Sequence, residues 1–191
     1  MQRSAKFLFL LFIFIIGPYC PALAINSEQT IVNAIQKNYQ SVRTFQAEFE
    51  QKSFVKMINR TEIAQGNVQI KKPGKMKWVY NDPDPQVLIS NQKNLWFYTP
   101  EDKQVTKMPI ESIYSSNTPA LFLAGQGILT NIFNVTEVIT GKNIYTVTLS
   151  PKEAKNDLNR LILRANKNNY QITGVTVYDD LGNKTQIKFK N

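Results

Sequence analysis

Few side chains in this sequence are suited to catalysis. The 191 residues include no histidine, and the single cysteine is Cys20. Ser-His-Asp and Cys-His catalysis, histidine metal sites and thiolate zinc sites are therefore excluded. Glu48 and Glu50 share the wet face of an expected strand, and Asp179-Asp180 lies in an expected turn, where Asp commonly bonds the backbone. With no glycine-rich phosphate loop either, we expect no enzyme, no metal and no cofactor.

The sequence offers large apolar side chains instead. Between Lys71 and Pro83, the residues Met76, Trp78 and Tyr80 alternate with basic or smaller residues. A strand of period two with three large side chains on one face either builds a core or lines an apolar cavity. The pattern alone slightly favours an ordinary core. The other members of this apolar set are Phe45, Phe49, Trp96 and Tyr98.

The first 24 residues have the features of a Sec signal peptide. Arg3 and Lys6 precede the apolar run Phe7 to Ile16, and Ala22-Leu23-Ala24 fits an A-x-A cleavage site. The apolar run is short for a membrane-spanning helix. We therefore expect cleavage after Ala24, and an exported, soluble chain that folds as one domain over residues 25–191.

Cys20 allows a rival interpretation, in which it is lipidated and anchors the chain to a membrane. A lipidated cysteine normally follows small residues, whereas Pro18 and Tyr19 precede Cys20. If the signal peptide is removed, the exported chain has no thiol. Its fold must then rest on burial rather than on disulfides.

The net charge is strongly positive, at +9. Two of the basic residues, Arg3 and Lys6, belong to the expected signal peptide. The remaining excess fits attraction to anionic lipid head groups or acidic partners, and it equally fits a charged, soluble surface. No dense basic run lies in a helical or zinc-finger context, so nucleic acid is not expected as a partner.

One helix should precede a long series of strands. Asn26 can cap a helix with Gln29 as its reciprocal partner, and the apolar residues at helical spacing are Ile31, Ala34, Ile35 and Val42. Strands of period two are then expected at 44–50, 63–70, 75–80, 86–90, 95–99, 104–108, 132–139, 144–150, 158–165, 171–178 and 184–190. Gly66 suggests a bulge or bend within the second of these strands.

A short apolar segment interrupts the strands. Thr118 can cap a helix, Pro119 suits a first helical turn, and Ala120 to Ala124 is apolar up to Gly125. This segment acts either as a core plug, the commoner case, or as a movable lid. The class is α+β, with about ten or eleven antiparallel strands in a strongly curved sheet or unclosed β-barrel.

Five motifs in this order resemble the family of periplasmic outer-membrane lipoprotein carriers, LolA, and they cover most of the expected exported chain. The motifs are Val42 to Gln51 with its F-x-A-x-F-x-Q pattern, Gly66, Lys72-Pro73-Gly74 with Trp78, Leu95 to Pro100, and Asn117-Thr118-Pro119 before the apolar segment. The resemblance implies an unclosed barrel with helices as a lid over a hydrophobic cavity. It also implies a chaperone of Gram-negative bacteria that takes triacylated lipoproteins from the inner-membrane ABC transporter LolCDE and passes them to the outer-membrane receptor LolB.

The resemblance also suggests which residues bind cargo. The expected cavity wall contains Phe45, Phe49, Met76, Trp78, Tyr80, Trp96 and Tyr98, with Leu121, Phe122 and Leu123 on the lid. Lys72 and Pro119 are expected at the rim, where Lys72 bonds a lid or loop carbonyl in the closed state. Lys72 stands where the family commonly has arginine, and it keeps the charge but loses the planar fork.

Three other functions remain open at this stage. The first is a LolB-like acceptor of the same fold, which would need a lipidated Cys20. The second is a shuttle for another lipid or glycolipid, and the third is a sensor of envelope stress. In each case we expect a monomer without nucleic acid as a partner.

Overall fold

The computed structural model describes residues 27–109, 129–153 and 158–190. Within these ranges one antiparallel sheet is the dominant feature, with a helix packed on it. The elements are α1 (Ser27–Ser41), β1 (Thr44–Val55), η1 (Lys56–Ile58), β2 (Arg60–Lys71), β3 (Lys75–Asp82), β4 (Gln86–Ser90), β5 (Asn94–Thr99), β6 (Gln104–Pro109), α4 (Leu129–Ile132), β7 (Phe133–Thr140), β8 (Ile144–Pro151), β9 (Leu158–Asn166), β10 (Ile172–Asp179) and β11 (Lys184–Lys190).

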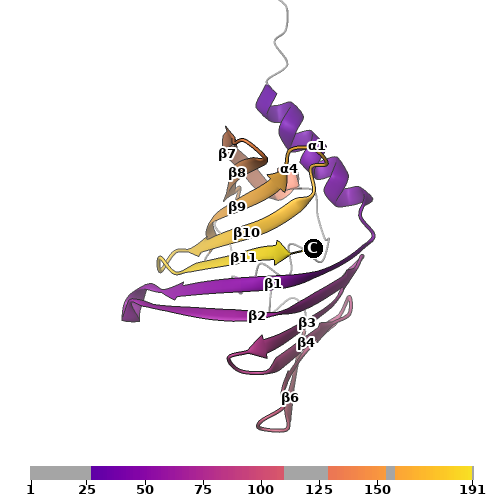
Figure 1. Cartoon of the computed structure of the whole chain (residues 1–191), viewed down its shortest axis with the longest axis vertical. Coiled ribbons are helices and arrows are strands. Elements are labelled where there is room, and N and C mark those ends of the chain that lie inside the picture. The colour runs from indigo at the N-terminus through magenta and orange to yellow at the C-terminus, as the bar shows by residue number, and fades with distance from the viewer. Residues whose placement is uncertain (1–26, 110–128, 154–157, 191) are drawn as a thin grey trace, which may run out of the picture.

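The described strands form a single 11-stranded sheet in the order β6-β5-β4-β3-β2-β1-β11-β10-β9-β8-β7. Figure 1 shows this order from β7 near the top to β6 at the bottom. Strands adjacent in sequence pair with each other, and the first strand β1 also pairs with the last strand β11. Within the described residues no ladder joins β6 to β7, so the barrel is unclosed, and the predicted fold class is confirmed.

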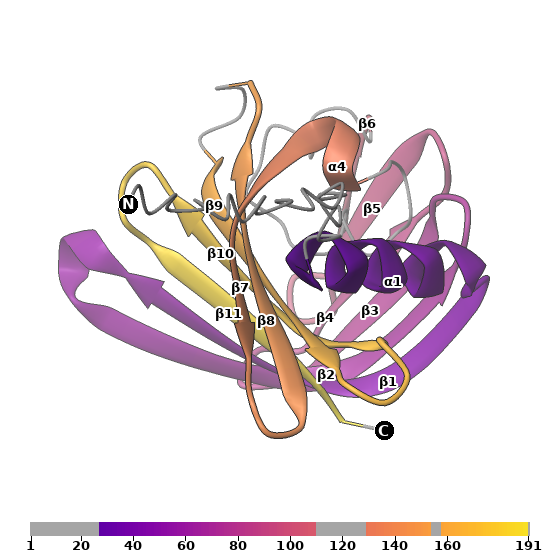
Figure 2. The same cartoon turned by 90° about the horizontal axis from the view of Figure 1, so that it is seen from above.

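Helix α1 lies within the curve of the sheet, as Figure 2 shows. It buries Val32, Ile35 and Tyr39, which recur at helical spacing. The prediction of this helix is confirmed, but its buried stripe is centred on Val32 and Tyr39 rather than on Ile31 and Ala34. Burial of this apolar stripe holds α1 on the sheet, since few of the other side chains of α1 are buried.

Alternation along the strands separates an inner face from an outer one. In β1, Ala47 and Phe49 are buried, while Gln46 and Glu48 between them are exposed. Trp78 in β3 has no exposed surface at all. The apolar core therefore lies between the inner face and α1, while the outer face carries most of the charged side chains.

The predicted irregularity at Gly66 is confirmed. The pairing of β2 with β3 shifts register between Gln65 and Gly66. Gly66 pairs with Phe49 on one side and Tyr80 on the other, and a Cβ at Gly66 would lie 1.8 Å from the carbonyl oxygen of Val79. Because position 66 has no side chain, the rings of Phe49 and Tyr80 can meet over it, with their centroids 5.0 Å apart.

One predicted strand boundary is wrong, and one predicted helix is not covered by the described residues. Ile132 was predicted to begin a strand, but it ends the short helix α4, and β7 begins at Phe133. Phe133 is buried and so anchors the start of the strand. The predicted apolar helix from Ala120 to Ala124 lies outside the described residues. None of the described helices is long and apolar enough to span a membrane.

We predict that Gly66→Ala lowers the free energy of unfolding by about 2–4 kcal/mol, because the added methyl group must displace the β3 backbone. Chemical denaturation monitored by circular dichroism measures this loss. Gln69→Ala, at an exposed position of the same strand, is the control and should change stability by less than about 0.5 kcal/mol. Equal stability of Gly66→Ala and wild type would contradict the close approach of β2 and β3.

Candidate functional site

Five aromatic rings form a continuous cluster on the inner face. Phe49 packs edge-on against Trp78 and Tyr80, with centroid distances of 4.8 and 5.0 Å. Phe45 meets Phe189 in the same way at 5.2 Å, and Phe189 lies 6.4 Å from Trp78. Edge-to-face pairs of this kind add to the stabilisation that burial provides. The structure thus brings together four of the predicted site residues, Phe45, Phe49, Trp78 and Tyr80.

Strand register explains why these residues meet. Phe45 pairs with Ile70, which pairs with Met76, so the three form one row across β1, β2 and β3. Side chains in directly paired positions point to the same face of a sheet. Met76, another predicted site residue, is buried in the same core. The inner wall is therefore built from long-range pairing, with Phe189 added from β11.

The cluster contains few polar atoms. The Tyr80 hydroxyl donates a hydrogen bond to Gln51 Oε1 at 3.0 Å, and burial raises the pKa of Tyr80 to about 12. Tyr80 therefore stays protonated over the whole physiological pH range. The indole nitrogen of Trp78 is buried and has no hydrogen-bond partner among the described residues. Such a surface suits apolar ligands far better than charged ones.

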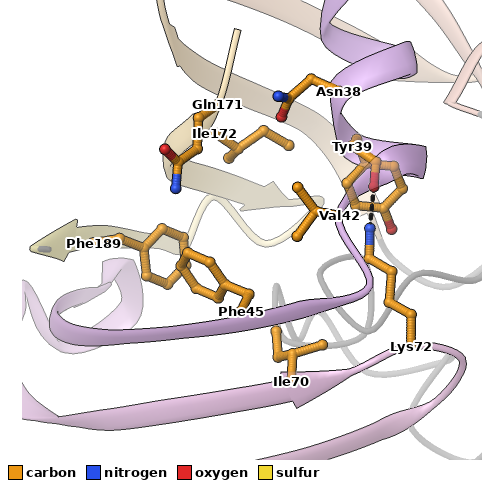
Figure 3. Close-up of a pocket in the computed structure, with 9 residues that line it drawn as sticks. All are labelled: Asn38, Tyr39, Val42, Phe45, Ile70, Lys72, Gln171, Ile172 and Phe189. Atoms are coloured by element: carbon orange, nitrogen blue, oxygen red, sulfur yellow. Dashed lines mark hydrogen bonds between the residues drawn. The ribbon is translucent and has the colours of Figure 1, made fainter. Parts of the chain in front are cut away.

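A small apolar cavity separates the end of α1 from the inner face. Nine residues line it, and Figure 3 shows them converging: Asn38, Tyr39, Val42, Phe45, Ile70, Lys72, Gln171, Ile172 and Phe189. Its volume is about 50 Å³. That is room for only one or a few water molecules. In this conformation α1 and the inner face are close to full contact.

Lys72 fastens the end of α1 to the sheet. Its Nζ donates a hydrogen bond to the carbonyl oxygen of Tyr39 and lies 3.5 Å from the centre of the Tyr39 ring. Its backbone nitrogen also donates to the carbonyl of Arg43, at 2.8 Å. The last turn of α1 contains no basic residue. Lys72 therefore supplies a positive charge that the negative end of the helix dipole favours.

The Lys72 ammonium is partly removed from water by this contact. Burial lowers the pKa of Lys72 from 10.5 to about 8. Lys72, predicted at the rim, lines the cavity, and the carbonyl that it bonds belongs to α1. The predicted rim and lid residues Pro119, Leu121, Phe122 and Leu123 lie outside the described residues.

A larger hollow continues along the inner face beyond the aromatic cluster. Its volume is about 580 Å³, and its wall includes Gln51, Ser53, Tyr80, Leu88 and Phe97. The wall mixes polar residues from β1 with apolar residues from β4 and β5. Tyr80 borders this hollow on one side and the aromatic cluster on the other.

Two predicted wall residues are in the wrong place. Trp96 pairs with Ile89, which pairs with Lys77, and Tyr98 pairs with Val87, which pairs with Val79. Both rows lie on the outer face of the sheet, whereas Trp78 lies on the inner face. The side chains of β5 that point inward are Leu95, which is buried, and Phe97. The placement of Trp96 and Tyr98 in the cavity wall is therefore wrong.

Other wall residues had not been singled out as site residues. They are Tyr39, Val42, Ile70, Phe97, Ile172 and Phe189. Ile70 and Phe189 each lie at an alternating apolar position of a predicted strand. No local signal tells which distant strand or helix covers the apolar face of either strand. Within the described residues, no group of three or more His, Cys, Asp or Glu side chains could hold a metal ion.

Comparison with known proteins identifies the family. The family model described as outer membrane lipoprotein carrier protein LolA matches residues 40–191. An outer-membrane lipoprotein carrier protein of Nitrosospira multiformis is 26% identical over 193 residues, which cover 99% of this chain and 87% of the relative. One from Legionella pneumophila strain Corby is 31% identical over 162 residues, 84% of this chain and 77% of the relative.

A solved structure supports the fold alone. The crystal structure of a DUF1329 family protein from Desulfovibrio piger has a TM-score of 0.50 and 11% sequence identity, and the match covers 86% of this chain and 91% of that one. Family assignment rests instead on the sequence match, which spans most of the chain and includes both the aromatic cluster and Lys72. The chain belongs to the LolA family of outer membrane lipoprotein carrier proteins.

Proposed function

We propose that this protein carries acylated lipoproteins through the periplasm and shelters their acyl chains against the inner face of its sheet. Residues 1–24 act as the export signal and are removed after Ala24. The carrier accepts lipoproteins from an inner-membrane ABC transporter of the LolCDE type and delivers them to an outer-membrane receptor of the LolB type. It catalyses no reaction, since ATP hydrolysis belongs to the transporter. The observation that supports this proposal best is the apolar inner wall beneath α1.

The physical need for a carrier follows from the acyl chains. Burial of hydrocarbon is worth about 0.8 kcal/mol per CH₂ group, so three chains of about 16 carbons leave a membrane very rarely unaided. A carrier must offer a comparable apolar surface. The inner wall offers one through Phe45, Phe189 and Ile70 at the cavity and through the adjoining rings of Phe49 and Trp78.

The hollow of about 580 Å³ already has room for a ligand, but loading of the space beneath α1 requires the wall and α1 to separate. A cavity of about 50 Å³ holds no acyl chain, so entry must displace α1 or the side chains beneath it. Within the described residues, the contacts of α1 with the rest of the chain include an apolar stripe, the bonds of Lys72 and two side-chain bonds to the backbone. These two bonds join Asn38 to the carbonyl of Asn169 at 3.0 Å and Gln36 to the amide of Leu129 at 2.8 Å.

Lys72 makes the closed state, in which α1 lies against the inner face, reversible. The hydrogen bond to Tyr39 and the contact with its ring favour closure, while the loss of water around the ammonium works against it. A half-buried lysine therefore holds α1 less firmly than its short contacts suggest. This balance suits a carrier that must open to load and to release.

We predict that Phe45→Asp reduces the amount of acylated lipoprotein that co-purifies with the protein from the periplasm by roughly tenfold or more, because a charge in the cavity opposes the burial of an acyl chain. Mass spectrometry of the bound lipoprotein measures the change. Phe54→Asp is the matched control, since Phe54 lies in the same strand but pairs with Lys184 on the outer face. It should keep its cargo.

Circular dichroism and thermal unfolding establish that both variants are folded. Undiminished cargo on folded Phe45→Asp would contradict the assignment of the cavity. Recovery of a glycolipid or another lipid from the wild type, in place of acylated lipoproteins, would contradict the proposed cargo.

The pKa of Lys72 gives a second prediction. The folded protein binds fewer protons at Lys72 than the unfolded chain between pH 8 and 10.5, because the pKa is lowered only in the folded state. The free energy of unfolding of the wild type should therefore rise relative to that of Lys72→Met as the pH increases from about 8 toward 10.5. Urea denaturation across this range measures the difference.

Lys72→Arg is the control, because arginine stays charged throughout this range. The free energy of unfolding of Lys72→Arg should change with pH in parallel with that of Lys72→Met, without the rise that is expected for the wild type. Parallel curves for the wild type and Lys72→Met would mean that Lys72 is not buried against α1.

A further inference from the structure

The outer face of β3 to β6 carries basic and apolar side chains in register. Lys77, Ile89, Trp96 and Lys107 form one row of directly paired residues across the four strands. The next row consists of Val79, Val87, Tyr98 and Val105. Together with Lys75, which precedes Lys77 on the same face, these residues define the outer patch.

The apolar part of the outer patch is unusually exposed. Ile89 is 44% exposed, Tyr98 37% and Val105 58%. Scattered exposed apolar residues are normal, but contiguous ones mark surfaces that bind a partner. These three are neighbours in the sheet. Ile89 pairs with Trp96, Tyr98 is the next residue of β5 on the same face as Trp96, and Tyr98 pairs with Val105.

The charge of the outer patch is purely basic. In the described part of the chain, Lys75, Lys77 and Lys107 take part in no ion pair. Among the described residues, the acidic residues nearest in sequence are Asp82, Asp84, Glu101 and Asp102, which lie at the β3–β4 and β5–β6 turns, beyond the row of Tyr98. The opposite turn, between β4 and β5, adds Lys93. An anionic partner therefore fits this face.

The type of basic residue separates a lipid surface from a protein. Protein interfaces are enriched in arginine and depleted in lysine. All basic residues of the outer patch are lysines, and they flank a tryptophan and a tyrosine. Tryptophan and tyrosine favour the boundary between lipid and water, and lysine can lay its apolar stem along such a boundary while its ammonium reaches the phosphates.

We propose that the outer patch docks reversibly on an anionic phospholipid surface, with Trp96 and Tyr98 at the level of the head groups and Lys75, Lys77 and Lys107 on the phosphates. This inference goes beyond the carriage of lipoproteins, since it concerns the face of the sheet opposite the cavity. Docking in this way leaves α1 and the inner wall away from the lipid. It brings the carrier to a membrane without requiring the cavity to open.

Trp96 itself provides the test. The sequence contains two tryptophans, and Trp78 is fully buried. Vesicles whose lipids carry bromine atoms on the acyl chains should quench the fluorescence of Trp96 when they contain phosphatidylglycerol. Vesicles of brominated phosphatidylcholine alone should quench little. Quenching should weaken with added salt, because exposed charges are screened.

Matched charge reversals locate the contact. Lys77→Glu should weaken binding to phosphatidylglycerol vesicles roughly tenfold, because it replaces an attraction at the lipid surface by a repulsion. Lys142→Glu makes the same change of charge at an exposed residue of the β7–β8 turn and should leave binding nearly unchanged. Trp96→Phe should remove the quenchable signal while sedimentation with vesicles persists.

Three results would overturn the proposal. The first is a lack of quenching and sedimentation with anionic vesicles. The second is an equal loss of binding in Lys77→Glu and Lys142→Glu, which would show attraction by net charge alone. The third is capture of an acidic protein through Lys77 and Trp96 without vesicle binding, which would assign the outer patch to a protein. All three tests use protein without cargo, so their failure leaves the carrier function untouched.

Discussion

Contact between α1 and the inner face of the sheet is the interaction on which the rest of this structure depends. The sheet exposes its inner apolar face toward α1, and that helix alone contributes Val32, Ile35 and Tyr39 to the buried core. Closure leaves only about 50 Å³ between α1 and the inner face, while opening would expose Phe45, Ile70 and Phe189 in the cavity wall to water. Within the described residues this contact includes an apolar stripe and a half-buried lysine, and it lies between these extremes.

Much of the fold could be predicted because local patterns determine it. Period-two alternation placed the strands to within a few residues, and Gly66 marked the irregularity in β2. The faces of β5 could not be predicted, since Leu95, Trp96, Phe97 and Tyr98 are all large and apolar. Only pairing with β4 and β6 decides which of them point inward. The same holds for Phe189, which reaches the cavity through the pairing of β1 with β11.

The two faces of β3 to β6 have different chemistry because successive side chains of a strand point to opposite faces of the sheet. Trp78 and Met76 are buried on the inner face, and Lys77 and Lys75 are exposed on the outer face of the same strand. Membership of the LolA family gives the inner face its proposed role, the sheltering of acyl chains. The outer face is free to bind something else at the same time. Alternation within one strand thus allows a carrier to hold cargo on one side and meet a surface with the other.

The most direct test of this account is the distance between α1 and the sheet with and without cargo. Spin labels at Gln40, at the exposed end of α1, and at Asn168, in the β9–β10 turn that α1 contacts through Asn38, report that distance by pulsed electron paramagnetic resonance. If α1 moves aside to admit acyl chains, the distribution should be short and narrow in the empty protein and longer and broader when an acylated lipoprotein is bound. An unchanged distribution on loading would show that α1 does not move to admit acyl chains, and it would contradict the account.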